Sequence, residues 1–269
     1  MKNLNVTIIQ TKLHWQNRAA NFNHLENLIA KINTPTQLIV LPEMFTSGFT
    51  MDAKAAADKP HGEVLAWMKS MALKKDATIV GSAVIEEDGN YYNRLLWVKP
   101  DGSFEHYNKR HLFRMAKENE HYAEGKTRLI TSIADWRICP LVCYDLRFPA
   151  WSRNINWSQK FERNHQYEVL VYVANWPERR SHAWKSLLVA RAIENQCYVV
   201  GVNRIGLDGN EISYAGDSVI INPLGEIISK TKANEESVES IELNLKDLLD
   251  YRNAFPAIHD ADEFEMKVL

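Results

Sequence analysis

Cys143 is the residue of this sequence best suited to covalent chemistry. It follows an apolar run, 138–142, that predicts a buried strand, and two charged residues, Asp145 and Arg147, come soon after it. Charged side chains make a poor core, so the chain must meet a polar cavity or the surface at this corner. A thiol placed there can act as a nucleophile. A cysteine after an apolar strand is otherwise a small buried hydrophobe, and its neighbours in space must decide between these interpretations.

An acid and an amine elsewhere in the chain complete a set that can act together. Glu43 follows a short strand predicted at 38–41 and precedes an apolar loop, which places its carboxylate in the wall of an apolar pocket. Lys109 lies in an irregular segment, 107–125, that mixes basic, acidic and apolar side chains. An ammonium favours a thiolate or an oxyanion, and a carboxylate can transfer the proton. Taken singly, Glu43 and Lys109 are more typical of solvated loops than of a catalytic site.

Apolar periodicity predicts the elements that must position these groups. Strands are predicted at 4–9, 38–41, 77–85, 91–98, 103–107, 138–142, 167–174, 197–202 and 237–243. Helices are predicted at 22–32, 64–72 and 245–251, in a stretch capped by Ser181, and at the start of the polar segment 151–164. Strands alternate with helices early and are joined by tight turns later, which indicates an α/β fold with a mixed sheet. Without a linker or an internal repeat, residues 1–269 form one domain.

Composition excludes several classes of function. The formal net charge is -2, which argues against a nucleic-acid partner, and no apolar run is long enough to predict a membrane span. Three cysteines without a CxxC pair predict neither disulfides nor a zinc site, and therefore a cytoplasmic protein. His106, His111 and His121 match no metal motif, and no P-loop or G-x-G-x-x-G occurs. We therefore expect no metal and no cofactor.

Three separated motifs carry a resemblance to a known family. LPEMFTSGF, YNKRHLF and LVCYDLRFP, in this order, resemble the three catalytic motifs of the nitrilase superfamily of carbon-nitrogen hydrolases. The stretches ANWP at 174–177, ARAIENQ at 190–196 and GDSVIINPLGE at 216–226 are also similar, and the set is most like the omega-amidase-like branch. The resemblance covers the whole chain. It implies a four-layer αββα sandwich with mixed sheets, assembled as a homodimer or higher homo-oligomer, with the tail from about 252 against a partner subunit.

The resemblance also implies roles for individual residues. Cys143 is the nucleophile, Glu43 the general base, and Lys109 stabilises the tetrahedral oxyanion together with the backbone amide of Tyr144. Glu118 is an additional acid that positions the lysine or the substrate amide. Glu120 is the rival for that last role.

The implied activity is hydrolysis of the terminal amide of a small carboxylic substrate, such as 2-oxoglutaramate or 2-oxosuccinamate, to acid and ammonia through a cysteinyl thioester. The distal carboxylate of such a substrate needs a cationic or hydroxyl partner. The residues predicted to bind the substrate are Tyr144, Phe113, Arg114, Arg147 and Trp176. Arg147 can equally be a structural brace for Asp145. The segment 156–165 is longer and more polar than the usual connection, and can cover the pocket.

Other functions fit the same residues. A nitrilase or an acyl-transferring relative would use the same Glu, Lys and Cys on a nitrile or with an acceptor other than water. A non-catalytic binding protein on this scaffold would not need the complete set. Ammonia release from amides and nitriles separates the enzymes, and the reactivity of Cys143 separates an enzyme from a binding protein.

Overall fold

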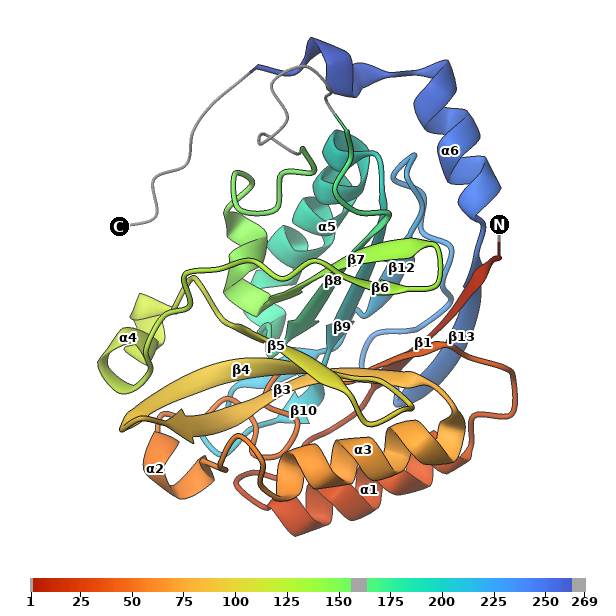
Figure 1. Ribbon diagram of the computed structural model, residues 1–269. Coiled ribbons are helices and arrows are strands. Elements are labelled where there is room, and N and C mark those ends of the chain that lie inside the picture. Colours follow the sequence, from red (N-terminus) through yellow and green to blue (C-terminus); the bar gives the residue numbers. More distant parts are fainter. Residues whose placement is uncertain (1, 156–163, 263–269) are drawn as a thin grey trace.

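The computed structural model describes residues 2–155 and 164–262, and they form two stacked β-sheets with helices on the outer faces (Figure 1). The layers run from helices α1 and α3, through a six-stranded and a five-stranded sheet, to helix α5. This arrangement is the four-layer αββα sandwich with mixed sheets that the sequence predicted.

The six-stranded sheet carries the first half of the chain. Its strand order is β13 (Ser237–Leu243), β1 (Leu4–Gln10), β2 (Leu38–Val40), β3 (Thr78–Glu87), β4 (Asn90–Val98) and β5 (Phe104–Asn108). Strands β1, β2 and β3 are parallel, and the other pairs are antiparallel. The carboxyl end of β2 and the end of β5 are therefore available to present the loops that begin at residues 41 and 109.

The five-stranded sheet carries the second half. Its order is β12 (Val219–Ile221), β9 (Tyr198–Asn203), β8 (Val169–Ala174), β7 (Trp136–Val142) and β6 (Thr131–Ile133). Strands β7, β8 and β9 are parallel, so residues that follow β7 and β8 emerge at the same edge of the sheet. Two short strands, β10 (Ile205–Leu207) and β11 (Ser213–Ala215), pair beside it.

Alternating side chains divide the core into layers. In β2, Leu38 and Val40 face the other sheet, whereas Ile39 packs with α1 (Arg18–Ala30) and α3 (Glu63–Lys75). On the opposite side, helix α5 (Ser181–Asn195) packs its buried residues against the five-stranded sheet. Because both faces of each sheet are covered, the strands are mostly buried and read as nearly continuous apolar runs.

Two details of the predicted helices are wrong. Trp151 and Ser152 form a turn rather than the start of a helix. Ser181 does not cap α5, because Arg180 occupies the N-cap position and the Ser181 hydroxyl instead donates to the carboxylate of Asp217. Residues 156–163 of the polar segment lie outside the described residues.

The C-terminal part of the described chain packs on its own subunit. Helix α6 (Leu245–Ala254) follows β13, and the buried Arg252 donates to the Tyr167 carbonyl at 2.8 Å and lies 3.2 Å from Glu168. Two short α-helices remain, α2 (Ala53–Ala56) and α4 (Glu118–His121), beside short 3-10 helices in the described chain. Within the described ranges, no helix has the length and apolar character needed to cross a membrane.

Candidate active site

Cys143 lies at the end of β7, where the chain turns into a short 3-10 helix, Cys143–Arg147. Its φ of 44° is in the left-handed region, which is costly for a residue with a Cβ. The turn is held by Asp145, whose carboxylate accepts the Val142 N-H at 3.0 Å. Backbone strain stored in this way is common at functional sites, and here it sets the direction of the thiol.

Glu43 emerges after β2 of the other sheet, and its side chain is fully buried. Its Oε1 accepts hydrogen bonds from Asn93 Nδ2 at 2.7 Å and from Lys109 Nζ at 2.9 Å. Its Oε2 accepts the Asn175 backbone N-H at 2.7 Å. The following residue, Met44, has a φ of 43°, so this loop also turns through a left-handed residue beside the site. Three donors therefore fix the orientation of one carboxylate.

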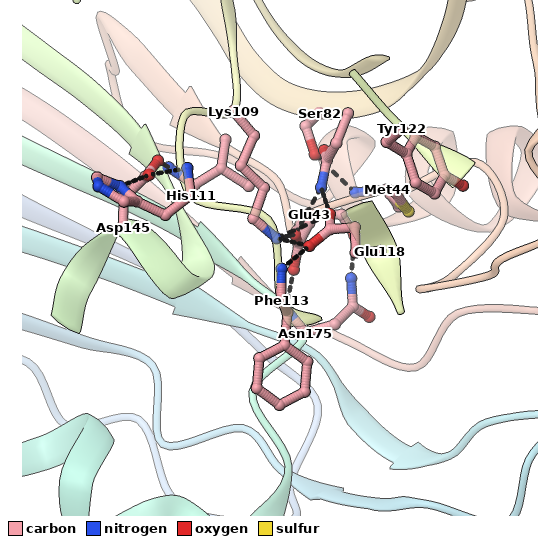
Figure 2. Close-up of polar contacts among 12 residues, drawn as sticks. Glu43, Met44, Ser82, Lys109, His111, Phe113, Glu118, Tyr122, Asp145 and Asn175 are labelled. Atoms are coloured by element: carbon pink, nitrogen blue, oxygen red, sulfur yellow. Dashed lines mark hydrogen bonds and ion pairs between the residues drawn. The ribbon is translucent and has the colours of Figure 1, made fainter. Parts of the chain in front are cut away.

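Lys109 follows β5 and is enclosed by two acids (Figure 2). Its ammonium lies 3.0 Å from both carboxylate oxygens of Glu118 and 2.9 Å from Glu43. Glu118 is held in turn by the Phe113 backbone N-H at 2.6 Å and by Asn93 Nδ2 at 3.2 Å. A buried amine with this many partners has a fixed position, as a group that must meet a developing charge requires.

The charges of the site are strongly coupled. Burial alone would lower the pKa of Lys109, but the carboxylates of Glu118 and Glu43 outweigh it and raise that pKa. Burial, opposed by Lys109 and reinforced by Glu43, raises the pKa of Glu118. The two carboxylates therefore stabilise the ammonium form of Lys109.

The surroundings of Cys143 favour the neutral thiol over the thiolate. Burial raises its pKa well above the usual range, the Glu43 carboxylate raises it further, and Lys109 only partly opposes them. The Lys109 charge is already compensated by two acids, so little of it is left to stabilise a thiolate. The charge of Glu43 acts directly on the thiol, and this carboxylate is the group placed to accept its proton.

A cavity of about 200 Å³ opens onto these groups. It is lined by Phe49, Lys109, Phe113, Met115, Ala116, Cys143, Tyr144, Arg147, Asn175, Trp176, Pro177, Arg179, Arg180, Ile212 and Tyr214. Its size suits a small molecule, and aromatic walls with a few convergent polar groups are typical of a ligand site.

The structure brings together most of the residues predicted for this site. Cys143, Lys109, Phe113, Tyr144, Arg147 and Trp176 line the cavity. Arg114 does not, and lines a separate pocket with His111 and Phe148. Glu118 rather than Glu120 contacts Lys109, since Glu120 is exposed and lies near Lys117 at 3.7 Å. Arg147 does not brace Asp145, because its guanidinium lies over the ring of Trp176.

Several residues of the site were missed in the sequence. Asn93 donates to both Glu43 and Glu118, and Asn175 donates its Nδ2 to the Glu43 carbonyl at 2.6 Å. Both have a buried side-chain oxygen without a hydrogen-bond partner among the described residues. A buried asparagine inside the apolar strand 91–98 was a detectable signal for Asn93. Arg180 was missed because it stands among charged residues, which are typical of a solvated loop.

No group of three or more His, Cys, Asp or Glu residues in the described parts of the chain is arranged to hold a metal ion. His111, one of the histidines considered for this role, instead donates its backbone N-H to Asp145 at 3.0 Å and stacks on Phe148. The reactive groups that the structure brings together here are a thiol, an ammonium and two carboxylates.

A buried thiol beside a carboxylate and an ammonium, on an αββα sandwich, defines a class of thiol hydrolase, and comparison with known proteins agrees. Residues 5–253 match the family model for carbon-nitrogen hydrolases. This chain therefore belongs to the carbon-nitrogen hydrolase family, within the nitrilase superfamily.

Individual relatives extend over the full chain. It is 47% identical over 266 residues to Omega-amidase YafV of Escherichia coli K12, covering 99% of this chain and 100% of that protein. It is 30% identical over 258 residues to 2-oxoglutaramate amidase of Bacillus subtilis, covering 95% and 96% of the two chains. A solved CN-hydrolase superfamily protein from Xanthomonas campestris, with an arsenic adduct in its active site, superposes with a TM-score of 0.95 at 39% identity, covering 99% and 100%.

Proposed function

We propose that this protein is an omega-amidase that hydrolyses the terminal amide of a small carboxylic substrate, with 2-oxoglutaramate as the representative case. The observation that carries the proposal is the contact of Lys109 with Glu43 and Glu118 beside the Cys143 thiol, in a cavity of small-molecule size. The relatives named omega-amidase and 2-oxoglutaramate amidase support the choice of substrate.

Acylation begins with a neutral thiol. Cys143 transfers its proton to Glu43 as its sulfur forms a bond to the amide carbon, because the raised pKa of the thiol disfavours a free thiolate. The amide oxygen becomes an oxyanion, which Lys109 Nζ and the Tyr144 backbone N-H stabilise. The proton on Glu43 then passes to the amide nitrogen, the C-N bond breaks, and ammonia leaves a thioester on Cys143.

Deacylation uses the same groups in the same order. Glu43 accepts a proton from water as the water oxygen attacks the thioester carbon, and Lys109 again faces the oxyanion. The C-S bond breaks, the proton on Glu43 returns to the sulfur, and the carboxylic acid is released. The two half-reactions balance with water as the only co-reactant, so they require no cofactor.

Glu118 acts through Lys109 and is a positioning residue. Both of its oxygens lie 3.0 Å from the ammonium, and the Phe113 N-H holds it from the other side. Because its charge also disfavours the thiolate, it helps keep the proton on sulfur until a substrate is attacked.

The test is ammonia release from 2-oxoglutaramate by the purified protein, with Cys143→Ala as the matched variant. We expect turnover by the parent and none by Cys143→Ala, while circular dichroism and thermal unfolding show that both are folded. Turnover that survives in Cys143→Ala contradicts the thioester mechanism. Ammonia from a nitrile of equal chain length but not from the amide would instead favour the nitrilase alternative, and transfer of the acyl group to hydroxylamine in preference to water would favour an acyl-transferase.

We also expect a homodimer acting in the cytoplasm. Exposed apolar side chains at Ile193 on α5, and at Leu224 and Ile227, support a subunit interface on this side of the molecule. The three cysteines are free and buried, which suits a reducing compartment. Light scattering on the purified protein measures the subunit number.

A further inference from the structure

Three arginines line the Cys143 cavity, and the described residues offer them no acid. Arg147, Arg179 and Arg180 border the same cavity as Cys143 and Lys109. Neither Asp nor Glu of the described chain forms an ion pair with any of the three, whereas Arg18, Arg94, Arg110, Arg137, Arg191 and Arg252 all have carboxylate partners. No carboxylate of the described chain therefore compensates the three positive charges that border this cavity.

The arginines lie on the solvent side of the cavity. Lys109 and Cys143 are buried, Arg180 is partly buried, and Arg147 and Arg179 are exposed. A substrate that presents its amide to Cys143 therefore points its other end toward them. Burial, with repulsion from Arg179 and Arg147, lowers the pKa of Arg180, and an anion would relieve this repulsion.

Arg180 is the least exposed of the three. Its guanidinium lies over the Phe113 ring at 5.0 Å, and its backbone carbonyl accepts the Trp176 indole N-H at 2.8 Å. Its backbone N-H donates to the Pro177 carbonyl at 2.9 Å. A guanidinium held in one orientation can donate two parallel hydrogen bonds to a carboxylate without a further loss of side-chain entropy.

Phe113 connects this arginine to the catalytic charges. The backbone N-H of Phe113 donates to Glu118 at 2.6 Å, and Glu118 contacts Lys109. The ring that supports Arg180 and the acid that supports Lys109 are thus attached to one short loop.

We propose that Arg180 binds the substrate carboxylate, and that it selects short amides carrying a negative charge at the end opposite the scissile amide. The inference rests on the proposed amidase function and deepens it. Arg147, exposed over the ring of Trp176, adds to the positive field without holding the carboxylate directly.

The experiment compares two amides of similar length in the same assay. Glutaramate carries a carboxylate, and pentanamide ends in a methyl group. For Arg180→Met we expect the KM for glutaramate to rise about 10- to 100-fold, as expected when a charge-assisted hydrogen bond is lost. The kcat for glutaramate and both constants for pentanamide should stay close to those of the parent. Arg180→Lys, which keeps the charge but not the fork, should recover part of the loss.

Arg114→Met is the control, because Arg114 lines the neighbouring pocket. The preference of this variant for glutaramate over pentanamide should equal that of the parent. An equal loss on both amides in Arg180→Met, or a preference removed by Arg114→Met or Arg147→Met but not by Arg180→Met, overturns the inference. Hydrolysis of both amides by the parent without preference overturns it too, and leaves the amidase function intact.

A second readout does not depend on turnover. Glutarate, which cannot be cleaved, should protect Cys143 from iodoacetamide in the parent and much less in Arg180→Met. If the parent releases ammonia from no amide, the proposed function fails and this protection still decides the role of Arg180. Equal protection in the two proteins refutes the inference.

Discussion

The Tyr107 hydroxyl donates a hydrogen bond to the Asp145 carboxylate at 2.8 Å, and this bond joins the two sheets directly behind the active site. Tyr107 lies on β5 two residues before Lys109, and Asp145 lies two residues after Cys143. The same hydroxyl accepts the Trp151 indole N-H at 3.0 Å. This buried contact, together with the His111 N-H that donates to Asp145, helps to set the separation of the ammonium and the sulfur.

Tyr107→Phe should therefore lower both stability and turnover. Asp145 and Trp151 lose a buried partner, which costs about 1 to 3 kcal/mol, and the loops that carry Lys109 and Cys143 become less firmly registered. Tyr198→Phe is the control, since its hydroxyl bonds the Asn244 carbonyl at 3.2 Å away from the cavity. Urea unfolding and kcat should show a stability loss in both variants but a kcat loss only in Tyr107→Phe. Equal kcat in the two would argue against the coupling.

Glu118→Gln replaces one of the two carboxylates around Lys109 by an amide of nearly the same shape. We expect kcat to fall about 100-fold through misplacement of the ammonium. The pKa of the Cys143 thiol should fall, because Glu118 helps to raise it, and iodoacetamide should therefore alkylate Cys143 faster at neutral pH. Glu120→Gln, on the exposed side of the same helix, should leave both readouts unchanged. If Cys143 were alkylated more slowly in Glu118→Gln than in the parent, Glu118 would not raise the pKa of the thiol.

Gly125→Ala tests the closure of the loop that carries Lys109. The Gly125 N-H donates to the Lys109 carbonyl at 2.9 Å, and an added Cβ would lie 2.0 Å from the Asn108 carbonyl oxygen. The backbone must move, so kcat should fall by more than the loss of folded protein can explain. Gly102→Ala is the matched control: its Cβ meets open space and only its left-handed φ of 80° is penalised, by about 1 to 2 kcal/mol. Normal kcat in Gly125→Ala would show that the loop tolerates the shift.

Stability should fall in alkaline solution, partly through Cys139. Burial raises the pKa of this thiol to about 12, so the unfolded chain releases its proton first. Stability from the neutral thiol is complete below the unfolded pKa of about 8.5 and is lost as pH rises toward 12, by about 1.4 kcal/mol per pH unit. Cys139→Ala should therefore show a shallower decline than the parent between pH 9 and 10.5 in urea unfolding. Leu141→Ala, a cavity in the same strand, should keep the parental slope.

The sequence predicted the strands well and the site in part, and the difference has physical causes. Strands such as β3 and β8 are buried on both faces, so an apolar run located them within about two residues. Cys143, Glu43 and Lys109 were recognised as candidates because reactive side chains follow predicted strands. The resemblance to the family motifs then implied a role for each of them. The helix expected at Trp151 failed because a polar pattern alone does not fix local geometry.

Other features of the site depend on contacts between distant segments. Nothing in the residue type of Cys143 indicates a left-handed backbone, which results from the hydrogen bonds of Asp145. Arg180 stands beside Arg179 and Glu178, a composition typical of a solvated turn. Only the folded chain places its guanidinium on Phe113, 67 residues earlier, and in the wall of a cavity.

The division of the reactive groups between two sheets has a consequence for how this molecule can fail. Asn93 lies in the first sheet, and Glu43 and Lys109 follow strands of it, whereas Cys143 and Asn175 follow strands of the second, so neither layer alone holds a working set. A small shift of one sheet relative to the other would abolish turnover, although each sheet would keep its secondary structure. Turnover therefore reports on the packing between the two sheets. During gentle heating, inactivation should precede any loss of the circular dichroism signal.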